Sequence, residues 1–147
     1  MSAPRLSSET VHASAVSIGG RAVLIGGRSG TGKSDLALRL IDRGAALISD
    51  DYTHIRRVKD QAIAGAPATI SGKIEMRGVG LVEMAPAADV PVALFVDLDR
   101  EPERMPDMGE RRMLAGVSIP TIGLAGYESS AALKVEAALR LFGLAAG

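Results

Sequence analysis

The chain of 147 residues is long enough for one globular domain, and its apolar share of 47% excludes an intrinsically disordered protein. Lysine plus arginine and aspartate plus glutamate number 17 each, which favours neither a nucleic-acid surface nor a membrane patch, and no apolar run reaches membrane-spanning length. The absence of cysteine excludes disulfides and thiolate metal sites, and with no signal peptide we expect a single cytoplasmic domain over residues 1–147.

The first third of the chain predicts a hairpin, a loop and a helix. Residues 1–10 are polar, and we expect them to be flexible. Partial alternation over Val11–Ile18 predicts a strand, and Gly19-Gly20 predicts a tight turn into a second strand, Arg21–Ile25. After a glycine-rich loop, apolar residues recur at helical spacing, and Gly44 marks the end of that helix.

The rest of the chain alternates short strands with loops and closes with a helix. Strands are predicted over Ala46–Ser49, Tyr52–Arg57, Val90–Val96 and Val117–Ile122. Residues 61–84 are expected to hold short strands and loops, and the charged stretch 97–112 to be exposed and mobile. Ser129 or Ser130 is expected to cap a final helix that ends at Gly143. These elements predict a compact α/β P-loop domain with a mixed sheet, a P-loop helix and a C-terminal helix.

A complete Walker A sequence, GRSGTGKS, lies between the second strand and the first helix. The residues expected to bind nucleotide phosphates are Gly27, Arg28, Ser29, Gly30, Thr31, Gly32, Lys33 and Ser34. The glycines let successive backbone amides turn toward phosphate oxygens at positions where a Cβ would clash. In this motif Lys33 reaches the β- and γ-phosphates, and the Ser34 hydroxyl binds the accompanying Mg²⁺. Because strand, loop and helix occur in the required order, we expect a nucleotide site for ATP and Mg²⁺ and not an incidental turn.

Two adjacent carboxylates, Asp50 and Asp51, directly follow the predicted strand that ends at Ser49. At a strand end, one of them can face Mg²⁺ while the other faces an attacking hydroxyl. A turn on the surface is the alternative interpretation of the pair. Asp97, at the end of another predicted strand, is the rival carboxylate for the metal. The sequence leaves open which aspartate of the pair accepts a proton.

Over about residues 11–124, the chain resembles the catalytic domain of bacterial HPr kinase/phosphorylase. The matching features are His12, the Walker A loop, the phrase Ile48-Ser49-Asp50-Asp51 and the segment Glu75–Gly80. That last segment reads EMRGVG and is close to the family's Glu-Ile-Arg-Gly-Leu-Gly signature. The order and approximate spacing are those of the family, and the small size resembles shortened alphaproteobacterial versions that lack the N-terminal domain.

The resemblance implies an ATP-dependent protein-serine kinase that modifies a small phosphocarrier protein, HPr or its nitrogen-branch relative NPr. It assigns catalytic roles to His12, Lys33, Asp50, Asp51 and Arg104, and magnesium binding to Ser34 and Glu75. In the family, the aspartate pair accepts the proton of the carrier's serine. The arginine would stabilise charge on the transferring phosphoryl group, and Arg104 is the best match to it.

The chain departs from the family near its C-terminus. Where the family has a proline-glycine-arginine-asparagine type segment tied to the phosphorylase reaction, residues 123–129 read GLAGYES and lack that arginine. The family's long tail after this segment is also reduced to one helix. The two differences argue against phosphorolysis of the phosphorylated carrier and against the family's usual hexamer. Kinase activity is less affected, because the residues assigned to it precede residue 105. A homo-oligomer formed through the apolar C-terminal helix stays open.

Two other functions remain open. A small P-loop kinase acting on a metabolite would need a lid, for which residues 97–112 are the candidate segment. A regulatory module could bind ATP and a partner without transferring phosphate, although the presence of Ser34, Asp50, Asp51 and Glu75 argues against such a degraded site. The sequence also leaves open whether ATP or pyrophosphate is the donor, and which carrier is the partner.

Overall fold

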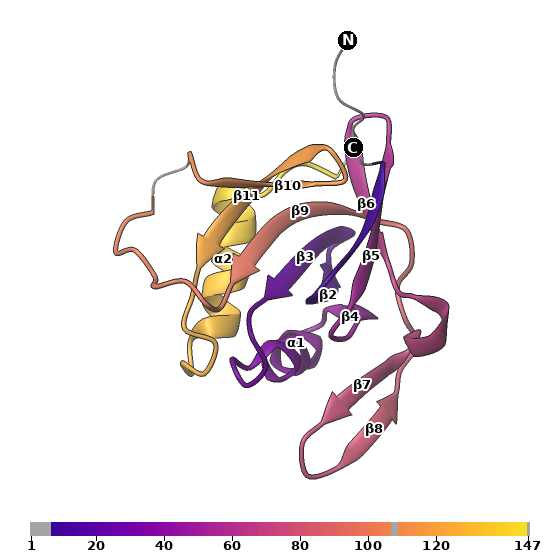
Figure 1. Ribbon diagram of the computed structural model, residues 1–147. Helices are drawn as coiled ribbons and strands as arrows, with labels where there is room; N and C mark the ends of the chain where they lie inside the picture. Colours follow the sequence, from indigo (N-terminus) through magenta and orange to yellow (C-terminus); the bar gives the residue numbers. More distant parts are fainter. Residues whose placement is uncertain (1–6, 107–108, 147) are drawn as a thin grey trace.

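In the computed structural model, which describes residues 7–106 and 109–146, one large curled mixed sheet packs against two helices (Figure 1). The strands of this sheet are β1 (Ser8–Val11), β2 (Ala13–Ile18), β3 (Arg21–Gly26), β4 (Ala46–Ser49), β5 (Thr53–Val58), β6 (Gln61–Gly65), β9 (Val90–Asp97), β10 (Arg111–Leu114) and β11 (Val117–Gly123). The helices are α1 (Lys33–Asp42) and α2 (Ala131–Phe142), with a short 3₁₀ helix, η1, over Ala68–Ile70. Strands β7 (Lys73–Met76) and β8 (Gly80–Glu83) form a separate antiparallel hairpin that projects from the body (Figure 1).

Strand β9 is the centre of the sheet, where the strand order divides. It pairs in parallel with β3 from Val92 to Asp97 along one edge. On the other edge, β6 pairs antiparallel with its first two residues, and β11 pairs in parallel with Phe95–Asp97. The main order is β1-β5-β6-β9-β3-β2-β4, with β10 joined to β11. Because β3, β9 and β11 are parallel, the loops that follow these three strands emerge at the same edge of the sheet.

Two apolar cores lie on opposite faces of the sheet. Along β3, Val23 and Ile25 belong to the core beneath the helices, whereas Ala22 and Leu24 belong to the other core. This alternation follows from the two-residue period of a strand, which points successive side chains to opposite faces. The second core contains fully buried Phe95 and residues of β5, β6, β10 and β11, so the curled sheet itself encloses it. No helix in the described part of the chain is long and apolar enough to cross a membrane.

Most of the predicted elements are confirmed, including the mixed α/β class and both helices. Gly19 and Gly20 connect β2 to β3 with φ angles of 59° and 82°, the left-handed values that a two-residue hairpin turn requires. Gly44, with φ 112°, follows the end of α1, where a left-handed residue commonly terminates a helix.

The N-terminal region differs from expectation at two points. The last residues of the stretch 1–10, which was expected to be flexible, belong to β1 (Ser8–Val11), and this strand pairs antiparallel with β5. The local sequence pattern could not predict this strand, because the strand depends on pairing with β5, which is distant in the sequence. The expected continuous strand Val11–Ile18 is interrupted at His12, which separates β1 from β2. Residues 1–6 lie outside the described part of the chain.

Two expectations about the C-terminal half also need correction. The stretch 97–112 was expected to be exposed and mobile, and most of its described residues are exposed, but Leu98 is buried and the stretch includes the end of β9 and the start of β10, where Arg111 and Arg112 pair with β11. Residues 107–108 lie outside the described part. Ser130 directly precedes α2, as expected, but its side chain makes no capping hydrogen bond.

A glycine substitution tests the close packing where β3 meets β9. A Cβ on Gly26 would lie 2.5 Å from Cζ of buried Phe95, whereas a Cβ on Gly65 in β6 would meet no atom within 4 Å. We expect Gly26→Ala to lower the free energy of unfolding by about 1–3 kcal/mol, since overpacking forces the core to shift. Gly65→Ala, the matched control, should leave it unchanged or raise it slightly. Urea unfolding followed by circular dichroism measures both, and equal midpoints for the two variants would contradict this packing.

Candidate active site

The glycine loop, residues 27–34, joins β3 to α1 at the edge of the sheet where the parallel strands end. Gly27, Gly30 and Gly32 have φ angles of 152°, 88° and 96°, so the loop depends on residues without a Cβ. The buried Lys33 turns its Nζ back to the loop and donates to the Gly27 carbonyl at 2.8 Å. The first-turn amides of α1 have no carbonyl partner one turn earlier in the helix, so this end of the helix favours an anion.

Asp50 is a buried carboxylate that connects three other elements. Its Oδ1 accepts hydrogen bonds from the Ser34 hydroxyl of α1 at 2.6 Å and from the Ser14 hydroxyl of β2 at 3.0 Å. Its Oδ2 accepts one from the Glu75 amide of β7 at 2.9 Å. With 8% of its surface exposed, Asp50 needs these donors, because a buried charge without partners is strongly unfavourable. The three bonds fix the Ser34 hydroxyl and bring the β7–β8 hairpin to the glycine loop.

Asp51 faces a different environment from its neighbour. Its backbone has φ 66°, and its side chain is 53% exposed. Oδ1 lies 2.9 Å from Nε2 of His12 and 4.0 Å from Nζ of Lys33. The His12 ring in turn stacks on Tyr52 with ring centroids 4.9 Å apart. The pair therefore provides one buried carboxylate on the Ser34 hydroxyl and one open carboxylate between a histidine and a lysine.

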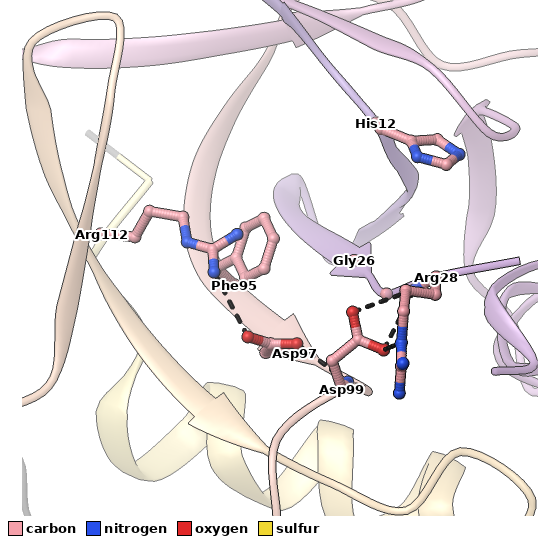
Figure 2. Close-up of a pocket in the computed structure, with 8 residues that line it drawn as sticks. His12, Gly26, Arg28, Phe95, Asp97, Asp99 and Arg112 are labelled. Atoms are coloured by element: carbon pink, nitrogen blue, oxygen red, sulfur yellow. Dashed lines mark hydrogen bonds and ion pairs between the residues drawn. The ribbon is translucent and has the colours of Figure 1, made fainter.

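A pocket of about 260 Å³ is lined by His12, the start of the glycine loop and the end of β9. Figure 2 shows the side chains that line it. Asp99 accepts hydrogen bonds there from the Arg28 amide at 3.0 and 3.1 Å and from the Arg28 Nε at 3.0 Å. These donors, the backbone amide foremost, hold the pKa of the Asp99 carboxyl below its ordinary value. Arg112 lies over the Phe95 ring and its Nη2 is 3.3 Å from Asp97 Oδ2.

The aspartate pair and its rival Asp97 have different contacts. Asp97 is bonded to Arg112 and to the Asp99 amide, whereas Asp50 contacts the Ser34 hydroxyl. Among the described residues, Asp50 of the pair is thus bonded to the start of α1, whereas Asp97 lines the neighbouring pocket.

Two other predicted site residues, Glu75 and Arg104, have fewer contacts with the aspartate pair. The Glu75 backbone amide donates to Asp50, the same carboxylate that accepts from the Ser34 hydroxyl, and Glu75 is exposed. Arg104 lies exposed in the loop between β9 and β10. Across residues 7–106 and 109–146, no hydrogen bond or ion pair joins Arg104 to His12 or to the aspartate pair.

Sequence reasoning missed Ser14, Tyr52, Asp99 and Arg112. Ser14 had a usable signal, because it shares a strand face with buried Val16 and a polar residue on a core face needs a partner. Tyr52 and Asp99 carried no such signal. Arg112 lies in the stretch that was expected to be exposed, and it is exposed, but it also pairs with Asp97 and lies over the Phe95 ring.

Comparison with known proteins points to one family. The family model described as HPr Serine kinase C-terminal domain matches residues 5–88. The HPr kinase/phosphorylase of Peptoclostridium acidaminophilum is 45% identical over 78 residues, which are 52% of this chain and 25% of that protein. The HPr kinase/phosphorylase of Limosilactobacillus reuteri (strain DSM 20016) is 34% identical over 135 residues, 83% of this chain and 41% of that protein.

A solved structure extends the similarity over nearly the whole fold. The structure of the Hpr(Ser) kinase/phosphatase from Coxiella burnetii matches with a TM-score of 0.76 and 28% sequence identity, covering 90% of this chain and 94% of that one. The chain spans about a quarter to two fifths of the length of the curated relatives it matches. Because the family model covers more than half of the chain and the structural match covers nearly all of it, the chain belongs to the HPr serine kinase C-terminal domain family.

Proposed function

We propose that the chain is an ATP-dependent protein-serine kinase that phosphorylates a seryl residue of a small phosphocarrier protein of the HPr type. The observation that carries this proposal is the division of the aspartate pair. Asp50 holds the hydroxyl of Ser34, and Asp51 opens to solvent next to Lys33. Such a division suits phosphoryl transfer, in which one carboxylate orders the metal side and another receives a proton. The names of the family relatives support a serine of HPr as the acceptor.

The residues of the glycine loop suit ATP with Mg²⁺. Its left-handed glycines, the first-turn amides of α1 and Lys33 form a donor set for phosphate oxygens. Ser34 and Glu75 are the proposed magnesium ligands, and their oxygens are of the type that Mg²⁺ prefers. When bound, Mg²⁺ would neutralise charge on the β- and γ-phosphate oxygens. Asp50 already accepts three hydrogen bonds, one of them from the Ser34 hydroxyl, so its proposed role is to position Ser34.

Asp51 is the proposed general base. In the step itself, the serine oxygen of the carrier forms a bond to the γ-phosphorus while the bond from that phosphorus to the ADP oxygen breaks. The serine proton goes to the Asp51 carboxylate, whose side chain is open enough for a protein substrate to reach it. His12, hydrogen-bonded to Asp51 and stacked on Tyr52, fixes the orientation of that carboxylate. Lys33 holds the transferring phosphoryl group, and Arg104 is proposed to add positive charge to it.

Replacement of the base should abolish transfer while leaving the nucleotide in place. We expect Asp51→Asn to reduce phosphorylation by about 10²–10⁴-fold, the usual contribution of a positioned acid or base. The measurement is intact-mass spectrometry of HPr-like and NPr-like carriers after incubation with the protein, ATP and Mg²⁺. Lys33→Ala should also remove the gain of one phosphate on a serine.

Asp60→Asn is the control, because Asp60 is an exposed aspartate in the turn between β5 and β6. It should phosphorylate the carrier at the rate of the unchanged protein. Full activity of Asp51→Asn would contradict its role as base. A protein that binds ATP but adds mass to neither carrier would point instead to a metabolite kinase or an ATP sensor.

The buried carboxylate has a different expected signature. Asp50→Asn loses the charge that orders the Ser34 hydroxyl, so we expect ADP to bind at least about 10-fold more weakly with Mg²⁺ present. Without Mg²⁺, the affinity for ADP should change much less. Titration calorimetry with and without Mg²⁺ measures both affinities for Asp50→Asn and Asp60→Asn. An equal loss under both conditions would show that Asp50 acts only by holding the fold together.

A further inference from the structure

Tyr127 lies across the glycine loop, and the assignments above give it no role. Its hydroxyl donates to the Gly30 carbonyl at 3.0 Å. A Cβ built on Gly32 would lie 3.1, 3.2 and 3.4 Å from Cζ, Cε1 and Cε2 of the tyrosine ring. These nearly equal distances mean that the loop backbone approaches the face of the ring and not its edge. One face of Tyr127 therefore rests on the last glycine before Lys33.

Tyr127 as a residue is nevertheless 67% exposed, although its ring lies close to the loop backbone. The backbone on either side of Tyr127 is held in place by neighbouring elements. Arg39 of α1 donates to the Gly126 carbonyl and, at 2.9 Å, to the Glu128 carbonyl. Gly126 is packed so tightly on the loop that a Cβ there would lie 2.6 Å from the Thr31 oxygen. Tyr127 is thus a preorganised flat surface that covers the loop and leaves much of its ring open.

The topology places this surface where the rest of a nucleotide would extend. Tyr127 follows β11, which is parallel to β9, just as the glycine loop follows the parallel strand β3. Sheets of this kind bind ligands outside the carboxyl ends of their parallel strands. A ligand anchored by phosphates in the loop has to place its remaining part next to the loop, along this same edge. Stacking on an aromatic side chain suits a flat nucleobase, because every base has a π face.

We propose that Tyr127 is the stacking platform for the purine base of the nucleotide whose phosphates bind the glycine loop. This assignment rests on the proposed nucleotide binding and adds the base subsite to it. It also gives a role to the segment 123–129, which lies outside the residues that the family model matches. The Tyr127 hydroxyl serves the loop and the ring serves the base, so the two contributions can be separated by substitution.

Inorganic tripolyphosphate has the phosphate chain of ATP without the base, so it measures the contribution of the phosphates alone. We expect Tyr127→Leu to weaken ATP binding by about 5- to 150-fold, the loss of one base–aromatic stack, while tripolyphosphate affinity stays within about twofold. Tyr127→Phe keeps the ring and removes only the hydroxyl, so it should bind ATP nearly as the unchanged protein does. Calorimetric titrations with Mg²⁺ present give all these affinities.

A second measurement does not depend on the leucine variant being folded. The chain has two tyrosines and no tryptophan, so a Tyr52→Phe protein leaves Tyr127 as its sole emitter. Its fluorescence, corrected for nucleotide absorption, should be quenched by ATP and not by tripolyphosphate. Equal losses of ATP and tripolyphosphate affinity in Tyr127→Leu, or equal quenching by both, overturn the stacking role. If the unchanged protein binds tripolyphosphate as tightly as ATP, the stacking role is overturned but the proposed nucleotide binding is not. If it binds neither ligand, the proposed nucleotide function is overturned as well.

Discussion

The buried carboxylate of Asp50 is the constraint on which the geometry of the site depends. A charge at 8% exposure requires hydrogen-bond donors, and here they come from β2, α1 and β7. The hydrogen bonds to this carboxylate connect elements that would otherwise contact one another only through apolar packing. The start of α1, strand β2 and the projecting β7–β8 hairpin are all held in place by hydrogen bonds to this one side chain.

The orientation of Asp51 follows from the burial of its neighbour. Ser14 accepts a hydrogen bond from the Asp51 amide and donates one to Asp50, so a single hydroxyl locks both residues. The chain then turns through a left-handed residue, and Asp51 faces outward toward His12. Holding a residue other than glycine at φ 66° costs about 1–2 kcal/mol, a strain that the buried hydrogen bonds of the turn offset. Two adjacent carboxylates thereby receive different surroundings, as different chemical tasks require.

The sequence predicted the local features well and the long-range ones poorly. Glycine spacing and helical periodicity are local signals, so they were sufficient to place the loop at 27–34 and helix α1. The choice between Asp50 and Asp51 could not be made, because it depends on Ser14, which lies 36 residues from Asp50. The edge strand β1 was missed for the same reason, since its pairing partner begins at Thr53. Arg104 was named from resemblance, and the structure leaves its proposed role without a contact.

Two parts of the chain contribute side chains to the site. Residues 5–88, which match the family model, contain the glycine loop, the aspartate pair and the hairpin with Glu75. The later residues add Asp99 on the Arg28 amide and Tyr127 on the loop. Both contacts restrain the loop from the same edge of the sheet. Apart from the charge proposed for Arg104, the groups proposed for phosphoryl transfer therefore lie in the first part, and the second part supplies side chains that hold the loop.

A crystal structure with Mn²⁺ and a non-hydrolysable ATP analogue is the decisive test of the divided aspartate pair, because anomalous scattering locates the metal. We expect the metal at about 2.1–2.2 Å from Ser34 Oγ, with Asp50 still hydrogen-bonded to that hydroxyl and Asp51 facing the γ-phosphate. Metal bound by Asp97 and Asp99, or an Asp51 carboxylate turned away from the γ-phosphate, would contradict this division of roles.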